Sequence, residues 1–169
     1  MSAKRIEEVI QDVLQDDAQR GALDFVAHLR ASGVPLEEES ETYWEAKYQD
    51  ESVCFLWVSG DADAPGPWTI WSDQVPGTWA TWPEGEATGE YVEFPIDDSI
   101  KETAWANVNV CANCGGCSVP GRRKTVLGKE FDNLCNSTMA FTNPDTAAVA
   151  CAKKMVDVRI GDILGTKKS

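Results

Sequence analysis

Four cysteines in the second half of the chain have a spacing that would let them act together. Cys111, Cys114 and Cys117 form a C-x-x-C-x-x-C run, and Cys135 follows 18 positions after Cys117. Two thiolates three positions apart can chelate one metal ion, and four cysteines fill every coordination position of zinc. A zinc ion enclosed in this way is structural rather than catalytic. The spacing therefore predicts a structural zinc site with these four ligands.

The same cysteines permit other interpretations. A second C-x-x-C pair is missing, because Thr138 stands three positions after Cys135. An iron–sulfur cluster accepts three clustered cysteines and a distant fourth, although in bacterial ferredoxins the fourth is close and precedes a proline. The cations of Arg122, Arg123 and Lys124 follow the cluster and would stabilise thiolates, which suits thiol redox chemistry. Thiols that bind nothing are the remaining interpretation. Cys54 and Cys151 are expected in the core.

A second group of residues could form a ligand surface. Trp68, Trp71, Trp79 and Trp82 lie in a stretch rich in glycine and proline. On a strand Trp68 and Trp71 would point to opposite faces, so that one is in the core and the other is exposed. Exposed tryptophans bind flat ligands, cations or peptides, and basic side chains hold anionic ones. The candidate surface comprises Trp71, Trp79, Trp82, Arg122, Arg123 and Lys129.

His28 is the single histidine of the chain. Cysteine–histidine pairs, serine–histidine–aspartate triads and two-histidine metal sites would all have to use it within one chain, so most hydrolase mechanisms are disfavoured. We expect His28 to be solvated, and we expect a binding domain rather than an enzyme. An enzyme that uses carboxylates in a tryptophan-lined cleft stays open as an alternative.

The charge of the chain is uneven. The total is −13; residues 1–100 carry −17, whereas residues 101–169 carry +4. A strongly acidic protein repels phosphate backbones and anionic lipids, which disfavours nucleic acid and membranes as partners. A small ligand or another protein is the expected partner. The first residues lack the apolar core of a secretory signal, and no window approaches a membrane span, so a cytoplasmic location is expected.

Hydrophobic periodicity predicts helices at both ends of the chain. Ile6, Val9, Ile10, Val13 and Leu14 have helical spacing, and a second helix begins at Asp16 or Asp17 and ends near Arg30, before Gly33. A third helix should begin at Asp97 or Asp98 and reach Val108. A last helix should begin at Asn143-Pro144 and end near Ile160. A short helix is expected over 129–135.

Strand formers occupy the middle of the chain. Residues 42–48, 53–58 and 68–71 are expected as strands, with 53–58 covered on both faces because it is continuously apolar. Glu37-Glu38-Glu39 is expected as a solvated connector, and 125–127 as a short strand. The predicted fold is α+β, with a small antiparallel sheet covered by helices and an irregular cysteine-rich loop. At 169 residues we expect a single domain, 1–169, with an acidic part (1–100) and a basic, cysteine-containing part (101–169).

A resemblance supports the single-domain prediction. Trp105-Ala-Asn-Val108 followed by the cysteine run, and Gly128-Lys-Glu-Phe-Asp132 followed by Cys135, resemble a pattern in a group of small bacterial proteins. Upstream segments at 44–48, 53–55 and 67–73 are similar to the same pattern. The group has no known activity, so the resemblance implies a bacterial, uncharacterised domain and no mechanism.

Overall fold

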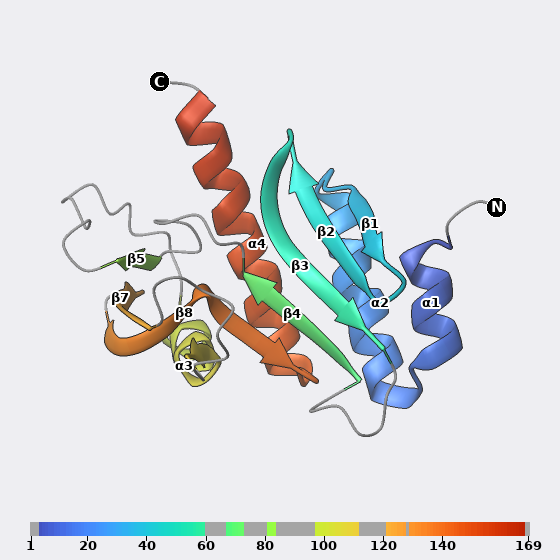
Figure 1. Cartoon of the computed structure of the whole chain (residues 1–169), viewed down its shortest axis with the longest axis horizontal. Helices are drawn as coiled ribbons and strands as arrows, with labels where there is room; N and C mark the ends of the chain where they lie inside the picture. The colour runs from blue at the N-terminus through green and yellow to red at the C-terminus, as the bar shows by residue number, and fades with distance from the viewer. Residues whose placement is uncertain are drawn as a thin grey trace.

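The computed structural model describes residues 4–59, 67–72, 81–83, 97–111, 121–127 and 129–167. Its helices are α1 (Ile6–Val13), α2 (Asp16–Ala31), α3 (Asp98–Ala106) and α4 (Thr146–Lys167). Its strands are β1 (Leu36–Ser40), β2 (Tyr43–Tyr48), β3 (Glu51–Val58), β4 (Trp68–Ser72), β5 (Thr81–Pro83), β6 (Val108–Val110), β7 (Arg122–Val126) and β8 (Lys129–Thr142). The fold is α+β, with helices packed on an antiparallel sheet, as the sequence predicts (Figure 1).

Strand β8 joins the two parts of the sheet. The strand order is β1-β2-β3-β4-β8-β7-β5, and β6 pairs with β8 outside this path. The last residues of β8 pair with β4, where Ile70 stands opposite Phe141, while its earlier residues pair with β6 and β7. Figure 1 shows β8 curving from the β5 and β7 region towards β4. Within the sheet, the cysteine-containing part is thus joined to the acidic part through one long strand.

Helices α2 and α4 lie behind β1–β4 in Figure 1, and α1 lies to the right of the strands and contacts α2 and β3. The side chains that face them form a row across four strands, because Trp44, Leu56, Ile70 and Phe141 stand opposite one another. All four are no more than 2% exposed. Burying such large apolar side chains against the helices is the main stabilising contribution of the core.

Polar contacts fasten α4 to its neighbours. The buried Arg159 donates from Nε to the carbonyl oxygen of Ser52 on β3 at 2.9 Å. Lys153 pairs with Asp24 of α2, and His28 lies 2.9 Å from a carboxylate oxygen of Asp157. These contacts fix α4 against both the sheet and α2. His28 is therefore half-buried and hydrogen-bonded rather than fully solvated.

Several element predictions are confirmed. Asp97 caps α3 by accepting from the N–H of Ile100 at 2.8 Å, and Gly33 has a φ of +76° just after α2. Trp68 is buried and Trp71 is half-exposed on the same strand, as alternation requires. Cys54 and Cys151 are fully buried.

Other predictions are wrong. The segment expected as a short helix over 129–135 is the start of β8, because pairing with β6 and β7 outweighs its helical spacing. Glu37-Glu38-Glu39 belongs to β1 rather than to a connector. Strand β3 was expected to be covered on both faces. One face packs on the helices, whereas Phe55 and Trp57 on the other face are only half-buried. Val108 lies in β6, beyond the end of α3.

The last helix also differs from its prediction. It begins at Thr146 and continues to Lys167, and its cap is Asp145 rather than Asn143. Within the described residues no helix has the length and apolarity needed to cross a membrane. The predicted cysteine-rich loop falls at 112–120, outside the described residues.

Candidate functional site

Two of the four predicted metal ligands come together at the β6–β8 pair. Cys111 follows β6, and its N–H donates to the carbonyl oxygen of Asn133 on β8 at 2.8 Å. Cys135 is two residues beyond Asn133 on β8, and Leu134 between them is buried, so alternation up to the register shift that begins after Leu134 puts Cys135 on the face of Asn133. Both cysteines are half-buried. Cys111 and Cys135 are thus diagonal neighbours across two paired strands.

Gly121 brings the far end of the cysteine-rich segment to the same place. An ideal Cβ on this glycine would lie 1.7 Å from Oδ1 of Asn133 and 3.5 Å from Cβ of Cys111. Its φ of +53° is in the left-handed region that favours glycine. The side chain of Asn133 also donates to the carbonyl oxygen of Cys111 at 3.4 Å. Residues 111 and 121, which flank the segment 112–120, are therefore held side by side against β8.

The other predicted ligands, Cys114 and Cys117, lie outside the described residues, and so does Trp79. Trp82 and Arg122 are in β5 and β7, but their side chains are not described.

The basic side chains that are described make contacts within the protein. Arg123 pairs with Asp132 at 3.1 Å and with Glu130 at 3.6 Å, both on the neighbouring β8. The ammonium of Lys129 lies 5.3 Å from the ring centre of Trp105 and 5.5 Å from that of Phe131. Their positive charges are thus partly balanced by these carboxylates and rings.

Trp71 is separated from these cations along β8. It stands opposite Ala140 near the end of β8, whereas Arg123 pairs with residues near its beginning. On the sheet its aromatic neighbour is Tyr43, with ring centres 6.1 Å apart, and Tyr43 in turn stacks on Phe55 at 5.6 Å. The described part of the predicted ligand surface therefore falls into two groups at opposite ends of one strand.

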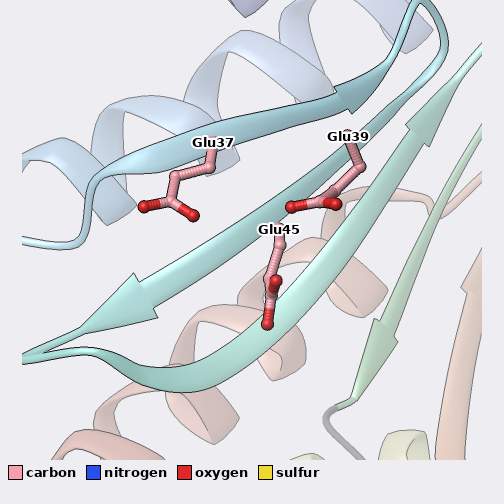
Figure 2. Close-up of side chains that lie close together, drawn as sticks. All are labelled: Glu37, Glu39 and Glu45. Carbon is pink, nitrogen blue, oxygen red and sulfur yellow. The ribbon is translucent and has the colours of Figure 1, made fainter.

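Three glutamates lie beside this aromatic group, and sequence reasoning missed them because it placed two of them in a connector. Glu37 and Glu39 of β1 and Glu45 of β2 bring carboxylate oxygens within 4.8 Å of one another (Figure 2). Within the described residues Lys47 pairs with two of them, at 2.9 Å from Glu37 and 3.8 Å from Glu45. One lysine among three carboxylates leaves a net negative charge at this place.

The aromatic group and the glutamates influence each other. Partial burial, followed by the charges of Glu45 and Glu39, raises the pKa of the Tyr43 hydroxyl. Both causes disfavour a phenolate, so Tyr43 stays neutral and keeps its hydrogen-bond donor.

A pocket of about 730 Å³ lies where α2 and α4 begin. Asp16, Asp24 and Asp145 are among its lining residues, together with Gly21 and Arg20. Its charges are largely engaged: Asp24 pairs with Lys153, Arg20 with Asp17, and Asp145 caps α4. No sequence motif marks this pocket, because its walls come from residues more than a hundred positions apart.

Cys151 is a buried cysteine outside the candidate metal site. Burial raises the pKa of the Cys151 thiol to about 12, so it remains a thiol at neutral pH. Its Sγ donates to the carbonyl oxygen of Ile100 at 3.6 Å. Cys151 is therefore a packing residue between α4 and α3.

Comparison with known proteins gives no family for this chain: no family model, no curated protein and no solved structure matches it.

Proposed function

We propose that this chain is a binding domain in which a structural zinc ion, held by Cys111, Cys114, Cys117 and Cys135, fastens the segment 112–120 to β8. The observation that carries the proposal is the diagonal placement of Cys111 and Cys135 on one face of paired strands. Diagonal neighbours in an antiparallel pair are about 7–8 Å apart between Cα atoms. Two sulfurs, each about 2.3 Å from a shared zinc ion, can bridge such a gap.

The surroundings of the two cysteines also suit zinc. Both are half-buried, and Asn133 contacts the backbone on both sides of Cys111. A rigid backbone beside a ligand keeps its sulfur in place when the metal binds. The segment between Cys111 and Gly121 would supply the other two thiolates, and its ends already meet at β8.

A binding role fits the described residues better than catalysis does. His28, the single histidine, is engaged by Asp157 between α2 and α4 rather than placed beside a nucleophile. Zinc with four thiolate ligands has no position for a substrate. The metal would therefore stabilise the fold, and recognition would rest on another surface.

Elemental analysis of the full chain, purified without added metal, tests this proposal. We expect about one equivalent of zinc, because structural sites bind zinc tightly enough to retain it during purification. Cys135→Ser should remove the zinc, whereas Cys151→Ala, which changes a buried thiol outside the site, should keep it. Less than about half an equivalent of zinc in the folded wild-type protein would contradict the proposal. Iron with visible absorbance would instead identify the cysteines as iron–sulfur ligands.

A further inference from the structure

The sheet has a second face, turned away from α1, α2 and α4, with an unusual composition. The register aligns Glu37, Glu45, Phe55, Trp71 and Ala140 in one row across five strands. In the neighbouring row Tyr43 stands opposite Trp57. We call the four rings Tyr43, Phe55, Trp57 and Trp71 the aromatic face, and Glu37, Glu39 and Glu45 the glutamate trio. All four rings are half-buried, in contrast to the fully buried row on the helix side.

The two groups adjoin each other. Glu45 stands directly opposite Phe55, and cross-strand neighbours have Cβ atoms about 4.5–5.5 Å apart. A cation that lies over the Phe55 ring, within about 6 Å of its centre, can therefore reach the Glu45 carboxylate as well. Figure 2 shows the glutamate trio gathered on the side of the sheet away from the helices. One surface thus offers ring faces and carboxylates to the same cation.

We propose that the aromatic face and the glutamate trio form a docking surface for a basic segment of a partner protein. This inference deepens the proposed binding function, and it does not depend on the zinc ion. Charge complementarity favours this occupant. The glutamate trio carries three negative charges, and Lys47, its one described partner, balances one of them. Residues 1–100 as a whole carry a net charge of −17. Such a field attracts basic partners and accelerates their association.

Arginine is the side chain that fits best. Its planar guanidinium stacks on aromatic rings and donates to carboxylates at the same time, whereas the compact ammonium of lysine is more strongly hydrated. The edge strand β1 adds a further feature. It ends the strand order, so within the described residues its outer edge is unpaired, and Glu37 and Glu39 lie along it. An extended segment that passes over β1 would bring its arginines first to the trio and then to the rings.

Binding of a synthetic peptide of alternating arginine and threonine tests the proposal. Tryptophan fluorescence and calorimetry at physiological ionic strength would measure the affinity of the full chain, with a citrulline-for-arginine peptide as the uncharged probe. The variant Glu37→Gln/Glu39→Gln/Glu45→Gln should weaken binding by about tenfold, as expected when several partly exposed ion pairs are lost.

A charge-matched control separates this surface from general attraction. Glu38→Gln/Asp98→Asn/Glu102→Gln removes three exposed carboxylates elsewhere; Glu38 is on the same strand β1 but stands opposite Trp44, on the helix side. This control should change the affinity by less than about threefold, because only long-range, screened attraction is lost. Phe55→Leu keeps an apolar side chain but removes a ring face, and it should also weaken binding.

Three outcomes would overturn the proposal. Equal weakening by the two glutamine variants would mean that the peptide responds to net charge alone. Equal affinity for the arginine and citrulline peptides would exclude recognition of cations. Concentration-dependent self-association of the wild-type chain that Phe55→Leu abolishes would identify a second copy as the occupant. Zinc content, measured on the same samples, separates this inference from the zinc proposal, since peptide binding by a zinc-free, folded chain contradicts only the latter.

Discussion

At the scale of single residues, Gly121 is more constrained in identity than the other glycines whose surroundings the structure describes, Gly21 and Gly33. Its φ of +53° would strain a larger residue, and the Asn133 side chain, 1.7 Å from an ideal Cβ, would have to move. To admit a Cβ, Asn133 would have to rotate away and give up its hydrogen bond to the carbonyl oxygen of Cys111. The side chain of Asn133 thus lies against both residues that flank the segment 112–120.

Gly121→Ala should therefore destabilise the protein more than an alanine at another glycine with positive φ. We expect a loss of about 2 kcal/mol, from left-handed strain plus the displaced side chain. Gly33→Ala is the matched control: its φ is +76°, but the nearest atom to its Cβ is 3.9 Å away, so only the strain of about 1 kcal/mol should appear. Urea unfolding of both variants measures the difference. A smaller loss for Gly121→Ala than for Gly33→Ala would contradict the role of Asn133.

At the scale of elements, α4 is the helix that contacts most of the fold, and its start is defined by Asp145. The carboxylate of Asp145 accepts from the N–H of Ala148 at 2.8 Å, and its carbonyl oxygen accepts from Val149 at 2.9 Å. This is N-cap geometry, in which a side chain satisfies one of the exposed N–H groups of the first turn.

Asp145→Ala should lower the free energy of unfolding by about 1 kcal/mol, because the N–H of Ala148 loses its acceptor. Asp145→Asn, which keeps an acceptor at the same position, should cost no more than a few tenths of a kcal/mol. Thermal and urea unfolding, with helix content followed by circular dichroism, check both values. If the two variants were equally unstable, the charge of Asp145 rather than its capping bond would be responsible.

The elements also show what the sequence could and could not predict. Helices α1, α2 and α3 were predictable because apolar spacing and the Asp97 cap are local signals. Strand β8 was not, since Phe131 and Leu134 have helical spacing and their strand conformation depends on partners in β6 and β7. The same applies to β1, whose charged residues pair with β2. Pairing between distant segments outweighed local preference in both cases.

Of the two candidate sites, one could be predicted from the sequence and the other could not. The cysteine spacing is a local pattern, so the sequence could suggest candidate zinc ligands before the positions of Cys111 and Cys135 were known. The aromatic face required the register of β1–β4, which aligns Glu45 with Phe55 and Trp71 across strands. Trp71 was singled out from the sequence, but its carboxylate neighbours could only come from the sheet.

At the scale of the whole molecule, the acidic and basic parts of the chain are joined by ion pairs as well as by the sheet. Lys153 of α4 pairs with Asp24 of α2, and the buried Arg159 lies 4.0 Å from Glu51. Within the acidic part, Arg30 of α2 donates two hydrogen bonds to the carboxylate of Glu7 on α1, of 2.9 and 3.2 Å. Opposite charges are thus placed where helices meet, in a molecule whose total charge of −13 otherwise favours expansion.

The Glu7–Arg30 pair should make stability depend on pH in a defined direction. The hydrogen bond from Arg30 lowers the pKa of Glu7 below its ordinary value of 4.5. A carboxyl group with a lowered pKa in the folded state contributes stability above its unfolded pKa, and this contribution is lost as the pH falls through the folded value. Glu7→Gln should therefore cost about 0.5–1 kcal/mol at neutral pH, a modest value because the pair is partly exposed.

The comparison that isolates this pair is Glu102→Gln, which removes the same charge from an exposed position on α3. Both variants relieve the repulsion that a total charge of −13 produces, so their difference reports the contacts of Glu7 with Arg30 and with Arg5. Urea unfolding should show this difference near neutral pH and its progressive loss as the pH falls below 4.5 and through the lowered pKa of Glu7. A difference that persists unchanged in acid would mean that Glu7 stabilises the contact between α1 and α2 through packing rather than charge.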